Sequence, residues 1–234
     1  MLISVHVPKT AGTTLLHHLK TQFTVFLDLE FLTTIPELYT RWPHNPGRVA
    51  GNWMHTSLLQ AIGNRSNLIK KMEGYDCIHG HFHVVKYRFL PNAKFITFVR
   101  EPLERMVSHY YFWKQVYEMG NPTKDIYIDD LFKRNTSLNE FLFEENLKNY
   151  QCRFIKGMHL SRYSFIGVAD EEYFADDIDY LFNKILKCPL EKVAVERLNK
   201  TAYNKSVSNV DIGAFRNFHK NDYELYEYAL QNRK

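Results

Sequence analysis

Hydrophobic residues along this chain fall into short continuous runs, separated by stretches in which they recur at helical spacing. A run of roughly four to eight apolar residues bounded by polar turns is typical of a buried strand. Strands are therefore predicted at residues 1–7, 25–29, 75–78 and 94–99 and in the segments YSFIGVA and KVAVERLN.

Apolar residues three or four positions apart predict helices between these strands. They begin directly after the first strand, at residues 13–23, and after the fourth, in the segment REPLERMVSHYYFW. Further helices are predicted at residues 138–157, 176–186 and 222–231. Residues 33–66, 117–137 and 199–209 are polar or rich in turn residues, so they are predicted as loops, with a short helix near 55–62.

Strands that alternate with helices indicate an α/β protein. We expect a P-loop-like three-layer fold, in which a central parallel sheet is flanked by helices. No repeat, low-complexity segment or linker divides the 234 residues, so residues 1–234 are predicted to form a single domain.

Composition narrows the class of partner. The formal net charge is +4 and the pI about 8.8. This suits an anionic ligand but falls short of the basic stripe of a duplex binder, so we expect no nucleic-acid partner. No run of apolar residues approaches the length that a membrane-spanning helix needs. Because the first strand begins at Met1, no signal peptide or anchor is expected, which indicates a cytoplasmic protein, or a Golgi lumenal one if this N-terminus is truncated.

The cysteines argue against a metal or disulfide framework. Cys77, Cys152 and Cys188 are widely spaced and form no CxxC pair. Reduced thiols are the simpler interpretation.

The segment HVPKTAGTT joins the first strand to the first helix. Amide groups at a helix N-terminus form an anion site, and Gly12 permits close backbone approach. Lys9 and the hydroxyls of Thr13 and Thr14 add further donors. The alternative is an ordinary helix N-cap at Thr13 with a surface lysine.

The segment FVREPLERMVSHYYF places Arg100 just past a buried strand and Ser108 about two turns into the next helix. Ligands collect at the carboxyl ends of parallel strands, and arginine binds phosphate with two hydrogen bonds. The alternative is that Arg100 pairs with Glu101 or Glu104 on the surface.

Taken together, these two segments resemble the cofactor-binding motifs of sulfotransferases that use 3′-phosphoadenosine 5′-phosphosulfate (PAPS). The segments YDCIHGHF, NYQCRFIKG and DYELYEYAL are similar to parts of the carbohydrate 2-O-sulfotransferase branch, of the heparan and uronyl types. The resemblance implies that the first loop holds the 5′-phosphosulfate and that Arg100 and Ser108 hold the 3′-phosphate. The implied cofactor-binding residues are Lys9, Thr10, Ala11, Gly12, Thr13, Thr14, Arg100 and Ser108, with Lys200 and Lys205 from a late loop.

The implied reaction is in-line transfer of a sulfuryl group from PAPS to a hydroxyl, and the resemblance favours the hydroxyl of a carbohydrate or glycan. The other product is adenosine 3′,5′-bisphosphate. Positioning and charge stabilisation dominate such transfers, and no metal is required. Lys9 would stabilise the leaving oxygen, and His81, or second His79, would be the general base. Gln151 and Arg153 are candidates to contact the acceptor or to order the site.

Other interpretations of these patterns stay open. His79, His81 and His83 alternate, which also suits a metal site or a hydrogen-bonded polar turn. A P-loop nucleotide kinase or NTPase would need a Gly-Lys-Ser/Thr ending that the first loop lacks. A non-catalytic binder of nucleotides or polyanions is the third class. Acceptor specificity is expected in residues 33–66 and 114–137, where basic and aromatic residues suit an acidic glycan.

Overall fold

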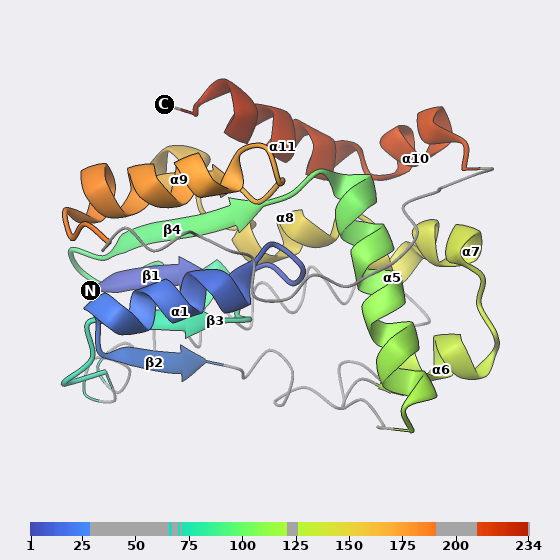
Figure 1. Ribbon diagram of the computed structural model, residues 1–234, viewed down its shortest axis with the longest axis horizontal. Coiled ribbons are helices and arrows are strands. Elements are labelled where there is room, and N and C mark those ends of the chain that lie inside the picture. The colour runs from blue at the N-terminus through green and yellow to red at the C-terminus, as the bar shows by residue number, and fades with distance from the viewer. Residues whose placement is uncertain (29–65, 67–69, 71, 121–125, 191–209, 234) are drawn as a thin grey trace.

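The computed structural model describes residues 1–28, 66, 70, 72–120, 126–190 and 210–233. Within them the strands form one parallel sheet in the order β2-β3-β1-β4-β5 (Figure 1). The strands are β1 (Leu2–Val5), β2 (Val25–Asp28), β3 (Cys77–Gly80), β4 (Lys94–Val99) and β5 (Tyr163–Val168).

Helices pack on both faces of this sheet, which confirms the predicted α/β fold class. The α-helices are α1 (Gly12–Gln22), α5 (Pro102–Glu118), α6 (Ile126–Lys133), α7 (Leu138–Leu142), α8 (Tyr150–Ile155), α9 (Phe174–Tyr180), α10 (Ile212–Phe218) and α11 (Lys220–Gln231). A π-helix, Leu181–Leu186, continues α9.

Successive side chains of a strand point to opposite faces of the sheet. Ile3 and Val5 join the core that contains residues of α8 and α11. Leu2, by contrast, joins the core under α1 and α9, together with Ile96 and Phe98 of β4. Because both faces are covered, the strands are almost continuously apolar, as the sequence shows.

A third apolar cluster lies past the carboxyl ends of the strands. It joins α5, α6, α7 and α10 through residues such as Met106, Leu131, Phe141 and Phe215. In Figure 1, α5 crosses the end of the sheet toward which the strand arrows point. The helix is thereby placed opposite the loop that leaves β1.

The structure corrects the predicted loop at residues 117–137. Helix α5 continues to Glu118, and α6 occupies Ile126–Lys133. Ile128, Leu131 and Phe132 are buried in the third cluster, so tertiary packing stabilises a segment whose overall composition is polar.

Smaller differences concern element ends. Strand β3 runs to Gly80 and so includes His79, whereas the predicted strand ended at residue 78. Helix α10 was not predicted, because its seven residues bury only Phe215. The predictions for residues 33–65, for the segment KVAVERLN and for residues 199–209 lie outside the described residues.

Candidate active site

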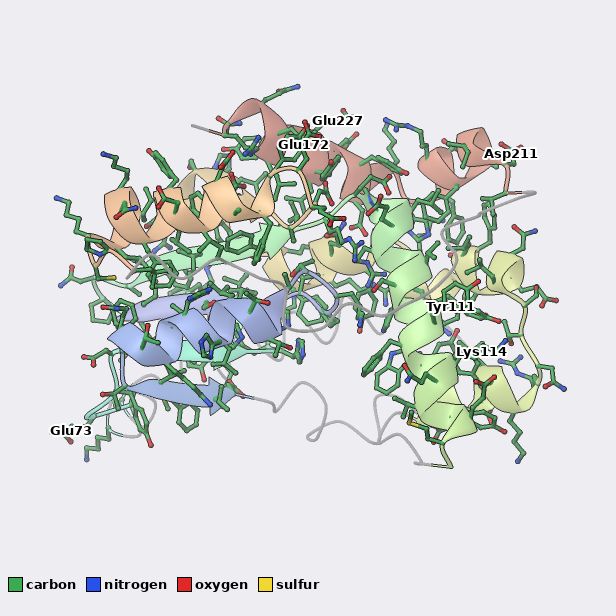
Figure 2. The ribbon with its side chains drawn as sticks, in the orientation of Figure 1. Glu73, Tyr111, Lys114, Glu172, Asp211 and Glu227 are labelled. Carbon is green, nitrogen blue, oxygen red and sulfur yellow. The ribbon has the colours of Figure 1, made fainter. Side chains whose placement is uncertain are left out.

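Three of the predicted site segments lie at the carboxyl edge of the sheet. The loop with Lys9 follows β1, His81 follows β3, and Arg100 follows β4. These three strands are neighbours in the order β3-β1-β4, so their ends are adjacent. Helix α5, on which Tyr111 and Lys114 are labelled, stands opposite this edge of the sheet (Figure 2). This edge is where ligands of open α/β sheets bind.

The first loop makes a tight turn into α1. Lys9 (φ 71°) and Ala11 (φ 59°) adopt left-handed backbone conformations. The Thr10 hydroxyl donates to the carbonyl of Val7 at 2.7 Å and ties the turn together. The N-cap is Ala11, whose side chain cannot cap the helix, and not Thr13. The N-cap alternative for Thr13 is therefore wrong, and the helix start keeps the features of an anion site.

Gly12 is required by a close contact with a residue that the sequence patterns did not single out. A Cβ atom at Gly12 would lie 1.9 Å from the His6 ring. The His6 ring therefore packs directly on the backbone where α1 begins. Any larger residue at position 12 forces the ring or the loop to move.

Lys9 lies close to α5. Its ammonium nitrogen lies 4.2 Å from the centre of the exposed Phe112 ring. Burial, followed by the positive charges of Arg100 and Arg105, lowers the pKa of Lys9 to about 8. The repulsion between these cations makes the vicinity of Lys9 favourable for an anion.

The backbone of Arg100 is held by Gln151. The Arg100 amide donates to Gln151 Oε1 at 2.9 Å, and Gln151 Nε2 donates to the Arg100 carbonyl at 2.8 Å. Gln151 is fully buried, and its backbone amide donates to the Asp222 carboxylate at 3.1 Å. The side-chain amide of Gln151 thus orders Arg100, one of the two roles that the sequence suggested for it.

The Arg100 side chain faces two carboxylates. Its guanidinium lies 3.0 Å from Glu104 and 4.0 Å from Asp170. The predicted alternative of a pair with Glu104 is therefore present in the protein without ligand. Such a partly exposed pair is weak, so a phosphate can replace it. Ser108, 4% exposed, lies further along α5.

Two histidines stack on His6. The rings of His81 and His79 lie 4.4 Å and 5.2 Å from the His6 ring, between centroids. Nδ1 of His81 lies 2.9 Å from the carbonyl oxygen of His6. Burial lowers the pKa of His81, while this hydrogen bond opposes the shift.

His79 and His83 occupy different surroundings. His79 is buried, lies 2.9 Å through Nδ1 from the Ser4 hydroxyl, and has a pKa lowered by burial to about 3. His83 caps the short 3-10 turn Val84–Lys86. Among the described residues, no group of three histidine, cysteine or acidic side chains is arranged to hold a metal ion.

Arg153 and the two late lysines complete the predicted set. The Arg153 guanidinium donates to the backbone carbonyls of Asn146 and, at 2.8 Å, of Lys148. It orders the turn before α8, and an acceptor contact stays a prediction. Lys200 and Lys205 lie outside the described residues. Sequence patterns missed His6, whose contacts with Gly12, His79 and His81 join segments that are distant in the chain.

Comparison with known families identifies the class of protein. The model of the sulfotransferase domain family matches residues 3–176, which cover every strand described above apart from Leu2 of β1. The chain therefore belongs to the sulfotransferase family, whose members generally use PAPS as the sulfuryl donor. No curated protein matches the chain. Among the described residues, no helix is both long enough and apolar enough to cross a membrane.

Proposed function

We propose that this protein transfers the sulfuryl group of PAPS to a hydroxyl of a carbohydrate or glycan, with His81 as general base. The observation that carries this proposal is the position of His6. Its ring packs against Gly12 at the start of α1 and stacks 4.4 Å from His81. A base and an anion-binding loop are therefore joined by one shared side chain.

The donor fits the charges at the edge of the sheet. The amides at the start of α1, with Lys9 and the hydroxyls of Thr13 and Thr14, would hold the 5′-phosphosulfate. Arg100 and Ser108, which both belong to the segment after β4, would hold the 3′-phosphate. Lys200 and Lys205 would add positive charge near that phosphate. This division gives the two ends of the nucleotide separate binding groups.

His81 and Lys9 would supply the chemistry. Nε2 of His81 accepts the proton of the acceptor hydroxyl as its oxygen bonds to sulfur. Lys9 and the loop amides stabilise the negative charge on the 5′-phosphate oxygen when its bond to sulfur breaks. The products are the sulfated acceptor and adenosine 3′,5′-bisphosphate. His79 is the second candidate base, but its burial and its contact with Ser4 favour a supporting role.

The acceptor class rests on the sequence. The HGHF segment is similar to that of the carbohydrate 2-O branch, and the basic and aromatic residues of 33–66 suit an acidic sugar. Sulfation of acidic glycans by labelled PAPS, with simple phenols and amines as comparison acceptors, tests this part. Transfer to phenols or amines alone would overturn the carbohydrate assignment while leaving sulfuryl transfer intact.

Calorimetric titration tests the donor. Adenosine 3′,5′-bisphosphate is expected to bind tightly. 5′-AMP is expected to bind much more weakly, because it lacks the 3′-phosphate that Arg100 and Ser108 would contact. ATP with magnesium is the third ligand, and equal or better binding of it would favour a nucleotide kinase. Tight bisphosphate binding without turnover on any acceptor would indicate a non-catalytic binder.

A further inference from the structure

Arg105 is a buried cation that has no ion-pair partner in the part of the chain that the structure describes. It lies on α5 and is 0% exposed. Its guanidinium contacts His109 Nδ1 at 3.4 Å, the sulfur of Met106, and the face of Tyr150 at 4.7 Å. Its Nε has no hydrogen-bond partner, and it forms no ion pair within 4.0 Å among the described residues. Its polar contacts with described residues therefore include no carboxylate.

Asp222, the carboxylate whose charge acts on Arg105, already accepts two backbone hydrogen bonds. Asp222 is 1% exposed, and its two oxygens accept the amides of Gln151 and Cys152 at 3.1 Å and 2.9 Å. Burial lowers the pKa of Arg105 to about 10, against the opposing effect of Asp222, so Arg105 stays charged at neutral pH. Burying a charge in this way is costly unless another charge compensates it.

The position of Arg105 connects it with the candidate donor site. Ser108 is three residues further on the same helix, and residues at this spacing share a helix face. Arg100 lies at the start of the same segment, and Lys9 contacts α5 at Phe112, 4.2 Å away. The carboxylates near this group, Glu104 and Asp170, face Arg100. Asp222, the third carboxylate nearby, accepts two backbone amides, so among the described residues none of the three forms an ion pair with Arg105.

We propose that Arg105 is a positioning charge for the nucleotide. It strengthens the binding of a ligand with phosphates at both the 3′ and 5′ positions, without touching it, and it makes the ligand-free fold less stable. The proposal rests on the proposed function, since the donor supplies the compensating negative charge. A buried charge acts through a low-dielectric interior, so its effect reaches the ligand with little screening.

The test compares Arg105→Met, which removes the charge at similar volume, with Arg105→Lys, which keeps it. Calorimetry with adenosine 3′,5′-bisphosphate is expected to show a loss of about tenfold or more for Arg105→Met, and a smaller loss with 5′-AMP. Arg105→Lys is expected to bind like the wild type at pH 7. The melting temperature of ligand-free Arg105→Met is expected to equal or exceed that of the wild type.

A matched control is Arg162→Met, which removes an exposed arginine just before β5, at the opposite edge of the sheet. Its bisphosphate affinity should not change. Bisphosphate affinity of Arg105→Met within twofold of wild type, or an equal loss in Arg105→Lys, would overturn the proposal. Failure of the wild type itself to bind the bisphosphate would instead overturn the proposed function.

If Arg105→Met does not fold, the pH dependence of Arg105→Lys decides. A buried lysine loses its proton at lower pH than an arginine. The affinity of Arg105→Lys for the bisphosphate should therefore fall more steeply above neutral pH than that of the wild type. If the affinity of Arg105→Lys changes with pH as that of the wild type does, the charge at residue 105 has no role in binding.

Discussion

Nδ1 of His81 lies 2.9 Å from the backbone carbonyl oxygen of His6. A carbonyl oxygen only accepts hydrogen bonds, so Nδ1 must carry the proton that it donates. In the neutral ring, Nε2 then has the free lone pair that a general base needs. Burial lowers the pKa of His81, which keeps the ring neutral at physiological pH. The backbone carbonyl of His6 thereby fixes the tautomer of the proposed base.

The contact between Gly12 and His6 predicts a substitution that blocks the donor loop. Gly12→Ala is expected to weaken bisphosphate binding by about tenfold or more, because its Cβ must displace the His6 ring. The double variant His6→Ala, Gly12→Ala should regain binding, since the obstructing ring is gone. Gly213→Ala on α10 is the matched helical control. Calorimetry measures all three, and an unaffected Gly12→Ala would show that the loop does not hold the ligand.

Gln151 is predicted to act through Arg100. Gln151→Leu leaves the Arg100 amide and carbonyl without their partner, a cost of about 1–3 kcal/mol for each buried group. Bisphosphate affinity should fall by about tenfold, whereas 5′-AMP affinity should change by less than about twofold, because Arg100 binds the 3′-phosphate.

Two calorimetric titrations of Gln151→Leu separate these effects. Equal losses for both nucleotides would contradict the assignment of Arg100 to the 3′-phosphate. A melting curve of the variant checks that any loss comes from the site and not from unfolding.

The pKa of Lys9, about 8, predicts a basic limit to donor binding. Lysine is positive below its pKa and neutral above it, so bisphosphate affinity should decline as pH rises through 8. A bound anion raises the pKa of Lys9 and so moves this limit to higher pH. Lys9→Arg stays charged over the whole range, so its affinity should not show this decline. If the affinity of wild type and of Lys9→Arg declines in the same way, a group other than Lys9 causes the decline.

Buried histidines predict a loss of stability in weak acid. Burial lowers the pKa of His79 and His83 to about 3 and that of His219 to about 4. The unfolded chain, with histidine pKa near 6.5, binds more protons as pH falls below that value. Each group therefore removes about 1 kcal/mol of unfolding free energy between pH 7.5 and 5.5. Urea denaturation at the two pH values measures this, and an unchanged midpoint would contradict it.

The sequence predicted the sheet well because its strands are short and almost wholly apolar. The segments around Lys9 and Arg100 were also predicted, since each lies where a strand passes into a helix. Helix α6 was missed because Ile128, Leu131 and Phe132 are stabilised by contacts with α5 and α7 and not by local composition. The roles of His6 and Arg105 depend on neighbours far away in the chain, so spacing alone does not reveal them.

The most direct test of the account compares wild type with His81→Ala in two assays on the same preparations. One measures binding of adenosine 3′,5′-bisphosphate, and the other measures transfer of labelled sulfuryl from PAPS to a panel of glycans. If His81 is the general base, wild type transfers the label, and His81→Ala binds the nucleotide with similar affinity but loses transfer by about a hundredfold or more. Transfer by His81→Ala at the wild-type rate, or no transfer by the wild type to any acceptor, would contradict it.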